Sequence, residues 1–170
     1  MFHVQTACRL HRTSELWHFE TIKLVMYESI TQVRVRYAET DQMNIVYYGN
    51  YAQYFEVGRV ESIRQLGYTY KDMEANGVIM PVVELNIKYL RPATYDDLLT
   101  IKTQIREMPT GHRIEFHQEV FNEQGKMLTS GKVLLYFLEL TSRRRTNIPE
   151  IMRERLEPYF TEAGSAVHGQ

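Results

Sequence analysis

Two hydrophobic periods follow one another between residues 30 and 67. Residues 30–37, ITQVRVRY, alternate apolar and polar side chains, which predicts a strand with one face toward water. Residues 50–67 instead carry apolar and small side chains at helical spacing, on a stripe broad enough for a helix packed on more than one side. Asn50 can cap the start of this helix and Gly67 its end. Gly58 predicts that another segment approaches the helix backbone closely.

The rest of the chain is patterned mainly as strands. A short second helix is predicted at 70–76, and a closing helix with Pro149 near its first turn lies at 148–160. Between them, four strand patterns follow at 82–90, 98–107, 112–121 and 126–140. The alternation in the first three predicts these inward residues: Leu85 and Tyr89, Leu99 and Ile101, Ile114 and Phe116. Short connections between them favour an antiparallel sheet with the long helix on one face, an α+β arrangement. Residues 133–138 are apolar on both faces, and the second face predicts cover by another copy of the chain.

The two ends lack such patterns. Residues 1–25 show neither alternation nor a helical stripe, and patterned sequence begins just after Met26. Two interpretations of this segment remain open: an upstream extension of a reading frame that starts at Met26, or a loosely ordered arm. Residues 161–170 are small and polar, as in a disordered tail. We therefore expect one domain at 26–160 between two disordered ends.

Composition excludes several functional classes. The 20 basic and 21 acidic residues give a net charge of −1, which argues against a nucleic-acid-coating protein. The single cysteine, Cys8, excludes an internal disulfide and a cysteine-based zinc site, and it favours a cytoplasmic setting. The sequence contains no apolar run long enough to predict an integral membrane segment. His112 and His117 fall on opposite faces of their strand pattern, so no metal site is predicted.

Three segments together resemble a known family. RYAETDQMNIVYYGNYAQYFEVGR, YLRPATYDDLLTI and FNEQGKMLTSGKVLLYFLEL are similar to the hotdog-fold acyl-CoA thioesterases of the 4-hydroxybenzoyl-CoA thioesterase type. The resemblance covers roughly residues 29 to 140, and the first segment is the specific one. It implies a hotdog fold, in which an antiparallel sheet of about five strands wraps around one long central helix, and assembly as a homodimer or homotetramer. It also implies hydrolysis of an acyl thioester of CoA or acyl carrier protein, with no cofactor.

The resemblance assigns roles to residues before the helix. It places the catalytic aspartate on Asp41, and the main-chain N–H that holds the thioester carbonyl on Tyr48. Asn44 stands where the family commonly has glycine, and asparagine still tolerates a positive φ. Gly49 lies beside Tyr48, where a helix start offers unpaired N–H groups to a developing oxyanion. Asp41 can then act as nucleophile or as base for water, with the gap before the helix leaving room for an acyl group.

Other interpretations of the same residues remain. Asp41 can instead be a loop aspartate bonded to nearby backbone. Some relatives use a helix glutamate, which points to Glu56, although Glu56 can equally pair with Arg59 or a strand residue. Glu39 is expected to face solvent. Four basic residues are candidates for binding the CoA phosphates, or else serve only solubility: Lys88, Arg91, Lys132 and Arg143.

Two functional classes follow from these observations. The first is an acyl-CoA thioesterase with its site at a dimer interface. The second is a non-catalytic hotdog domain that binds acyl thioesters as a sensor or a complex subunit. Asp41 favours the enzyme, because a binding module does not need a carboxylate beside a helix start.

Overall fold

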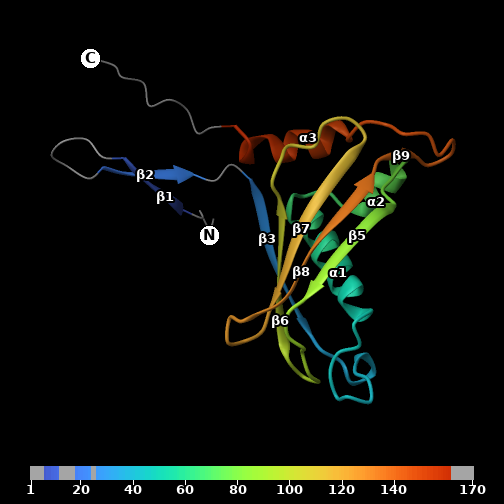
Figure 1. Cartoon of the computed structure of the whole chain (residues 1–170). Coiled ribbons are helices and arrows are strands. Elements are labelled where there is room, and N and C mark those ends of the chain that lie inside the picture. The colour runs from blue at the N-terminus through green and yellow to red at the C-terminus, as the bar shows by residue number, and fades with distance from the viewer. Residues whose placement is uncertain (1–5, 12–17, 24–25, 162–170) are drawn as a thin grey trace.

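A five-stranded antiparallel sheet forms the body of the molecule (Figure 1). The computed structural model describes residues 6–11, 18–23 and 26–161. The strands lie in the order β3-β6-β7-β8-β5, with every neighbouring pair antiparallel, so the predicted sheet of five strands is confirmed. Their bounds are β3 Tyr27–Arg34, β5 Val82–Tyr89, β6 Leu98–Ile105, β7 Arg113–Phe121 and β8 Met127–Tyr136.

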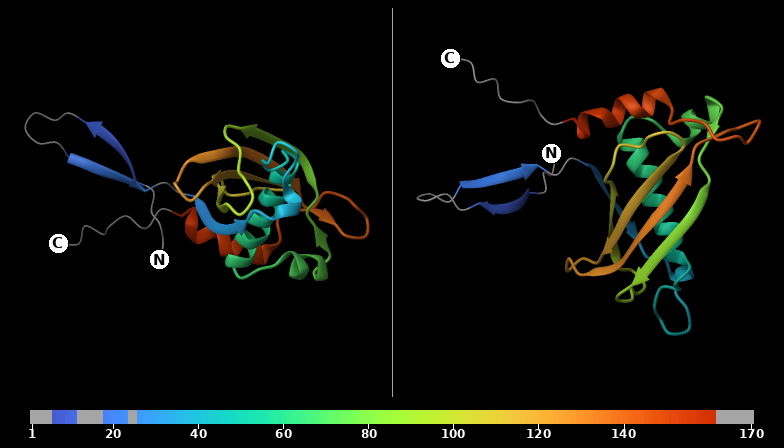
Figure 2. Two further views of the ribbon diagram at one scale, coloured as in Figure 1. Left: turned by 90° about the horizontal axis from the view of Figure 1, so that it is seen from below. Right: turned by 45° about the horizontal axis from the view of Figure 1, so that its top comes forward.

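Helix α1 (Asn50–Gln65) runs along the inner face of the curved sheet (Figure 2). Gly58 permits the close contact that its position predicted: a Cβ there would lie 2.7 Å from Cγ2 of Ile101 and 2.8 Å from Oγ1 of Thr103. Gly131 on β8 permits a similar close contact from the sheet, since a Cβ there would lie 2.5 Å from the Phe55 ring of α1. At these two positions the helix and the sheet therefore pack backbone against side chain.

The C-terminal end of α1 matches the prediction, and the N-terminal end differs from it. Gly67 adopts φ 78°, and the Tyr68 N–H reaches back to the Ile63 carbonyl at 3.4 Å, as in a glycine-ended helix. At the start, however, Gly49 is the N-cap and Asn50 is the first helical residue. The prediction that Asn50 caps the helix is wrong, because its side-chain amide donates to the Glu39 carbonyl at 2.7 Å.

Shorter elements cover the ends of the sheet. Helix α2 (Tyr70–Ala75) is present as predicted and is capped by Thr69. Strands β4 (Val78–Ile79) and β9 (Leu138–Glu139) pair with each other, and helix α3 (Glu150–Leu156) begins directly after Pro149. Two single 3₁₀ turns complete the elements, η1 at Tyr37–Glu39 and η2 at Glu157–Tyr159. Because β3 ends at Arg34, Tyr37 leaves the inward row predicted for it and is 78% exposed.

The neighbouring strands β5 and β8 differ in exposure. Strand β5 is an edge strand, and large apolar side chains on or beside it are exposed: Val82, Val83, Leu85, Tyr89 and Leu90. Strand β8 lies inside the sheet, with Val133 and Leu135 buried toward α1. On its other face Leu134 and Tyr136 are half-buried, and the Tyr136 ring packs against His112 and Arg145.

Part of the N-terminal segment has regular structure. Strands β1 (Thr6–His11) and β2 (His18–Lys23) pair antiparallel, although the sequence pattern predicted no element there. The remaining residues of the two predicted disordered ends, 1–5, 12–17, 24–25 and 162–170, lie outside the described residues. In the described part of the chain, no helix is long and apolar enough to span a bilayer.

Candidate active site

Residues 39–47 fold back on themselves just before α1. An isolated bridge pairs Thr40 with Val46, and the Asp41 N–H donates to the Ile45 carbonyl at 2.9 Å. Asn44 turns the chain with φ 59°, which confirms the expected positive φ at this position. The residues between Asp41 and the helix therefore form a closed hairpin-like turn, where the sequence had suggested open space for an acyl group.

The Asp41 carboxylate has one structural partner. Its Oδ1 accepts a hydrogen bond from the Met43 N–H at 2.8 Å, which is the local bond expected of a loop aspartate. Its Oδ2 accepts no hydrogen bond within the described part of the chain, and the residue is only half-buried. One oxygen thus orients the carboxylate and the other is available to a substrate or to water.

The start of α1 presents two unpaired N–H groups. The Asn50 N–H donates to the Tyr47 carbonyl, and the next two N–H groups donate to the carbonyls of Tyr48 and Gly49. The N–H groups of Tyr48 and Gly49 themselves have no acceptor among residues 26–161. These are the two donors that the sequence predicted, and a helix start adds a partial positive charge to them.

Aromatic rings surround these donors. The Tyr47 and Tyr48 rings lie 4.5 Å apart, and Tyr89 of β5 packs edge-on against both Tyr48 and Tyr51. The Tyr89 hydroxyl donates to the Tyr48 carbonyl at 3.1 Å, which fixes the peptide group that carries the Gly49 N–H. Gly49 leaves space for the Tyr47 ring, because a Cβ at this position would lie 2.8 Å from it.

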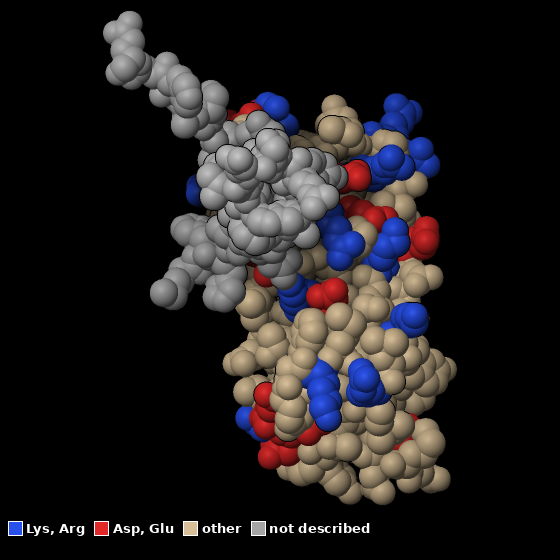
Figure 3. All heavy atoms as spheres, turned by 60° about the vertical axis from the view of Figure 1, so that its left-hand side comes forward, with Lys and Arg blue, Asp and Glu red and all other residues tan. Residues whose placement is uncertain are grey.

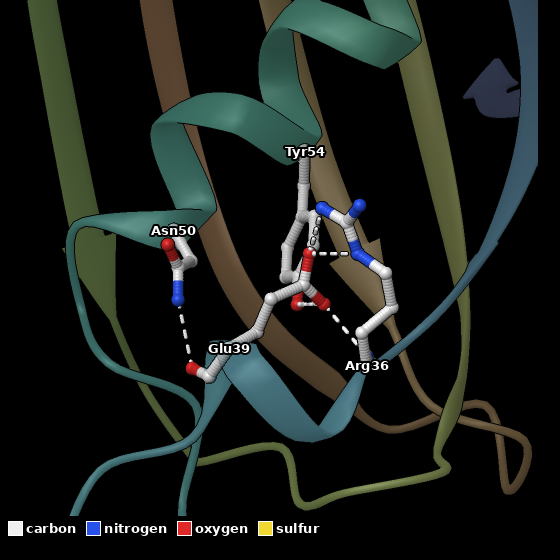
Figure 4. A network of polar contacts seen from close by, with 4 residues as sticks. All are labelled: Arg36, Glu39, Asn50 and Tyr54. Carbon is white, nitrogen blue, oxygen red and sulfur yellow. Dashed lines mark hydrogen bonds and ion pairs between the residues drawn. The ribbon is translucent and has the colours of Figure 1, made fainter.

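Glu39 holds this loop to the helix (Figure 4). Its carboxylate accepts hydrogen bonds from the Arg36 backbone N–H at 2.7 Å, from the Arg36 guanidinium at 2.6 and 2.9 Å, and from the Tyr54 hydroxyl at 2.9 Å. Its carbonyl accepts from the Asn50 amide and from the Tyr47 N–H. The expectation that Glu39 faces solvent is wrong, since the residue is 4% exposed.

The charge state of Glu39 follows from these contacts. Burial alone would raise the pKa of the Glu39 carboxyl, but hydrogen bonds from Arg36 and Tyr54 to the ionised form outweigh burial and lower the pKa. The hydrogen bond between Glu39 and Tyr54 has the opposite effect on the pKa of Tyr54. Burial and the neighbouring carboxylate both raise the pKa of the Tyr54 phenol. Glu39 is thus an ionised, structural carboxylate two residues before Asp41.

Glu56 lies apart from the Asp41 loop within one chain. It is the seventh residue of α1, and its side chain is exposed. It forms no ion pair or hydrogen bond with the described residues, so neither Arg59 nor a strand residue is its partner. Arg59 instead points toward β7, where it contacts Gln118.

The four predicted phosphate-binding residues do not form one cluster. Lys88 and Lys132 lie on the adjacent strands β5 and β8, on the outer face, where Lys132 pairs with Glu115 at 3.1 Å. Arg91 follows β5 and donates to the Met127 carbonyl. Arg143 lies in the turn after β9, at the other end of α1 from Asp41. The face shown in Figure 3 also mixes basic with acidic side chains.

Cavities occur at the end of the sheet remote from Asp41. One of about 540 Å³ lies between the β6–β7 loop and α3, and is lined by Met108, Ile148 and Phe160 among others. Another of about 390 Å³ lies across the same loop, beside Arg113 and His117. Burial, and then the charge of Arg106, lower the pKa of His117. In the described residues no group of three or more His, Cys, Asp or Glu side chains could hold a metal ion.

Sequence comparisons find a matching family model and similar known proteins. The family model described as the thioesterase-like superfamily matches residues 35–156. YneP of Bacillus subtilis, named as a candidate acyl-CoA thioesterase, is 41% identical over 60% of this chain and 73% of its own length.

Solved structures are similar over most of the chain. A DHNA-CoA thioesterase from Staphylococcus aureus is 38% identical over 71% of this chain and 80% of its own, with a TM-score of 0.68. A structure of 4-hydroxybenzoyl-CoA thioesterase in complex with 4-hydroxybenzoyl-CoA is 20% identical and covers 76% of this chain and 99% of its own. Its TM-score of 0.69 shows a shared fold.

Proposed function

Because the chain belongs to the thioesterase-like superfamily, we propose that it hydrolyses acyl-CoA thioesters to a free acid and CoA at the site formed by Asp41 and the start of α1. The observation that carries this assignment concerns the part of the chain that the structure describes: there the N–H groups of Tyr48 and Gly49 have no acceptor, and the preceding loop holds Asp41 with one carboxylate oxygen that accepts no hydrogen bond.

The chemistry follows from these groups. The thioester carbonyl oxygen accepts hydrogen bonds from the Tyr48 and Gly49 N–H groups, which stabilise the negative charge that develops on it. Asp41 then attacks the carbonyl carbon, or removes a proton from the water that does so. The thiolate of CoA leaves, and water supplies the oxygen of the free acid. Water is the only co-reactant this sequence of steps requires, so we propose no metal or redox cofactor.

Neighbouring residues serve the site indirectly. Glu39 holds the loop against Tyr54 and so fixes where Asp41 stands relative to α1. The Tyr48 side chain is 62% exposed and acts through its backbone, while the Tyr89 hydroxyl positions the peptide that follows it. Lys88 and Arg91, on and just after β5, remain candidates for the CoA phosphates, whereas Arg143 lies too far along the sheet to serve the same chain's site.

The assembly is part of the proposal. The apolar side chains exposed along the β5 edge support a homodimer in which two sheets meet at this edge, with a homotetramer as its further assembly. In each chain α1 is the central helix of the hotdog fold, and in such a dimer Glu56 becomes available to the partner's site. A cytoplasmic setting stays a prediction from the single cysteine.

The Asp41→Asn variant tests the mechanism. Asparagine keeps the shape and the bond to the Met43 N–H, but it removes the charge and the basic lone pair. We expect kcat to fall by at least about two orders of magnitude, with little change in KM. Steady-state hydrolysis of short, long and aromatic acyl-CoAs by both proteins measures this and also reports the preferred acyl group.

Tyr48→Phe is the matched control. It keeps the backbone N–H, so we expect only a mild change in kcat. If Asp41→Asn keeps nearly full kcat, Asp41 is only a loop residue and the mechanism is wrong.

A further inference from the structure

A buried arginine on α1 lacks a counter-charge. Arg59 is 6% exposed, and within residues 26–161 no carboxylate lies within 4.0 Å of its guanidinium. Its Nε has no hydrogen-bond partner among the described residues, and its Nη1 reaches Oε1 of Gln118 only at 3.5 Å. A bond of that length is at the outer limit of a hydrogen bond. The guanidinium therefore loses little if it turns toward a stronger acceptor.

The two groups that contact Arg59 directly are uncharged. Gln118 is uncharged, and its amide already donates to the Phe55 carbonyl at 2.8 Å and to Thr103 at 3.0 Å. Burial raises the pKa of the Tyr70 hydroxyl of α2 to about 12, and the nearby Arg59 charge lowers this pKa only in part. At neutral pH Tyr70 is thus a neutral phenol. Burying a cation without an anion is costly, so proteins normally supply one.

The position of Arg59 indicates where that anion comes from. Arg59 lies ten residues after Gly49 on α1, which corresponds to roughly 15 Å of helix rise. Helix side chains lean toward the N-terminus, so the guanidinium lies nearer to the Tyr48 and Gly49 donors than its Cα does. We place a small acyl group along α1 in this direction, with its carbonyl on those donors. Its far end then falls within reach of the guanidinium.

We infer that Arg59 is a specificity-determining residue that binds an acidic oxygen, carboxylate or phenolic, at the end of the acyl group remote from the thioester. The guanidinium suits this role because its planar donors match a carboxylate in two parallel hydrogen bonds and can also meet a single phenolic oxygen. The inference rests on the proposed thioesterase function and assigns the substrate class of the same site. Arg59 would thus favour acyl groups that carry such an oxygen over plain alkyl and aryl groups.

Two pairs of substrates test this on the wild-type protein. The pairs are glutaryl-CoA with pentanoyl-CoA, and 4-hydroxybenzoyl-CoA with benzoyl-CoA. We expect kcat/KM to be roughly ten- to a hundredfold higher for one or both oxygen-bearing members, as expected for a buried hydrogen bond to a charged group. The pair with the larger ratio identifies the oxygen as carboxylate or phenolic. Equal rates within both pairs would overturn the inference, while any hydrolysis of benzoyl-CoA or pentanoyl-CoA would leave the proposed function in place.

Variants then assign the preference to Arg59. Arg59→Gln should abolish the ratio while leaving kcat/KM for the member without the oxygen within about threefold. Arg59→Lys, which keeps the charge but loses the planar donors, should keep part of the ratio. The control is Arg64→Gln on the same helix, an exposed arginine paired with Glu61, which should leave the ratio unchanged.

Other outcomes would contradict the inference. If Arg59→Gln lowers both members of a pair equally in a folded protein, Arg59 is structural. If the variant instead dissociates into monomers in sedimentation, the missing anion belongs to a second copy of the chain. If Arg59→Gln does not fold, the wild-type ratios and the Arg59→Lys variant still test the role of Arg59. Loss of all thioester hydrolysis in the wild type would refute the proposed function itself.

Discussion

The Tyr54 hydroxyl donates a hydrogen bond of 2.9 Å to Oε2 of Glu39, and this bond joins the second turn of α1 to the loop that carries Asp41. Both residues are almost completely buried. The bond therefore couples the position of the predicted carboxylate to the position of the predicted oxyanion donors. Disturbing it should affect both stability and turnover.

Glu39→Gln should lower the free energy of unfolding at pH 7 by about 1–3 kcal/mol, since it weakens hydrogen bonds to a buried charged group. The pKa of Glu39 is lowered in the folded protein, so its stabilising contribution is present above the ordinary glutamate pKa of about 4.3. It is lost as the pH falls below that value through the folded pKa. The difference between wild type and variant should shrink over the same range, which urea unfolding at several pH values measures.

The control is Glu61→Gln, which removes an exposed i,i+3 pair with Arg64 and should change stability little. A Glu39→Gln protein as stable as the wild type at pH 7 would show that the network does not hold the loop.

The sequence predicted the fold well where local pattern and tertiary contacts agree. The alternation in β6 and β7 correctly identified Leu99, Ile101, Ile114 and Phe116 as buried, because these strands lie inside the sheet with α1 on one face. The same alternation in β5 marked Leu85 and Tyr89 as inward, yet both are exposed. An alternating pattern shows which residues share a face, but it does not show whether a strand lies at an edge.

The candidate site was predicted less completely. The positive φ of Asn44 and the unpaired N–H groups at the helix start could be predicted because turn geometry and helix starts are local properties, whereas the catalytic role of these groups stays a prediction. Glu39 was missed because its burial depends on Arg36, Tyr54 and Asn50, which meet only once the loop folds back. Arg59 was seen only as a possible partner of Glu56, and a missing counter-charge can be recognised only in three dimensions.

Gly58→Ala should destabilise the protein by about 1–3 kcal/mol, because the added Cβ would overlap Ile101, Thr103 and Gln118 on the sheet. The helical conformation itself would accept alanine, so the loss reports the close contact alone. Gln53→Ala at an exposed position of α1 is the control and should have little effect. Thermal unfolding of both variants measures the difference, and equal melting temperatures would show that α1 can move away from the sheet.

Deleting residues 1–25 should leave folding and activity nearly intact, because the sequence of this segment carries no recognisable core pattern. A longer deletion, of residues 1–28, should be far more costly. It removes Tyr27, whose hydroxyl donates to the Ser62 carbonyl at 2.6 Å and whose ring packs against Tyr159. We expect this deletion to lower the free energy of unfolding by roughly 3 kcal/mol, which corresponds to about 10 °C in Tm. A large drop in Tm for the shorter deletion would mean that the hairpin of β1 and β2 contributes to the fold.

Mixing two inactive variants tests whether one site needs two chains. Within one chain, Asp41 precedes α1 and Glu56 is exposed two turns into it, with no contact between them. If each site combines Asp41 of one chain with Glu56 of the other, Asp41→Asn and Glu56→Gln are each inactive alone. After subunit exchange, half of the dimers contain both variants, and each of these has one intact site, so about a quarter of wild-type activity should return. Two outcomes contradict the shared site: full activity of Glu56→Gln alone removes Glu56 from the chemistry, and no recovery on mixing confines each site to one chain. Sedimentation of the mixture, with the two variants carrying different fluorophores, confirms that exchange has taken place.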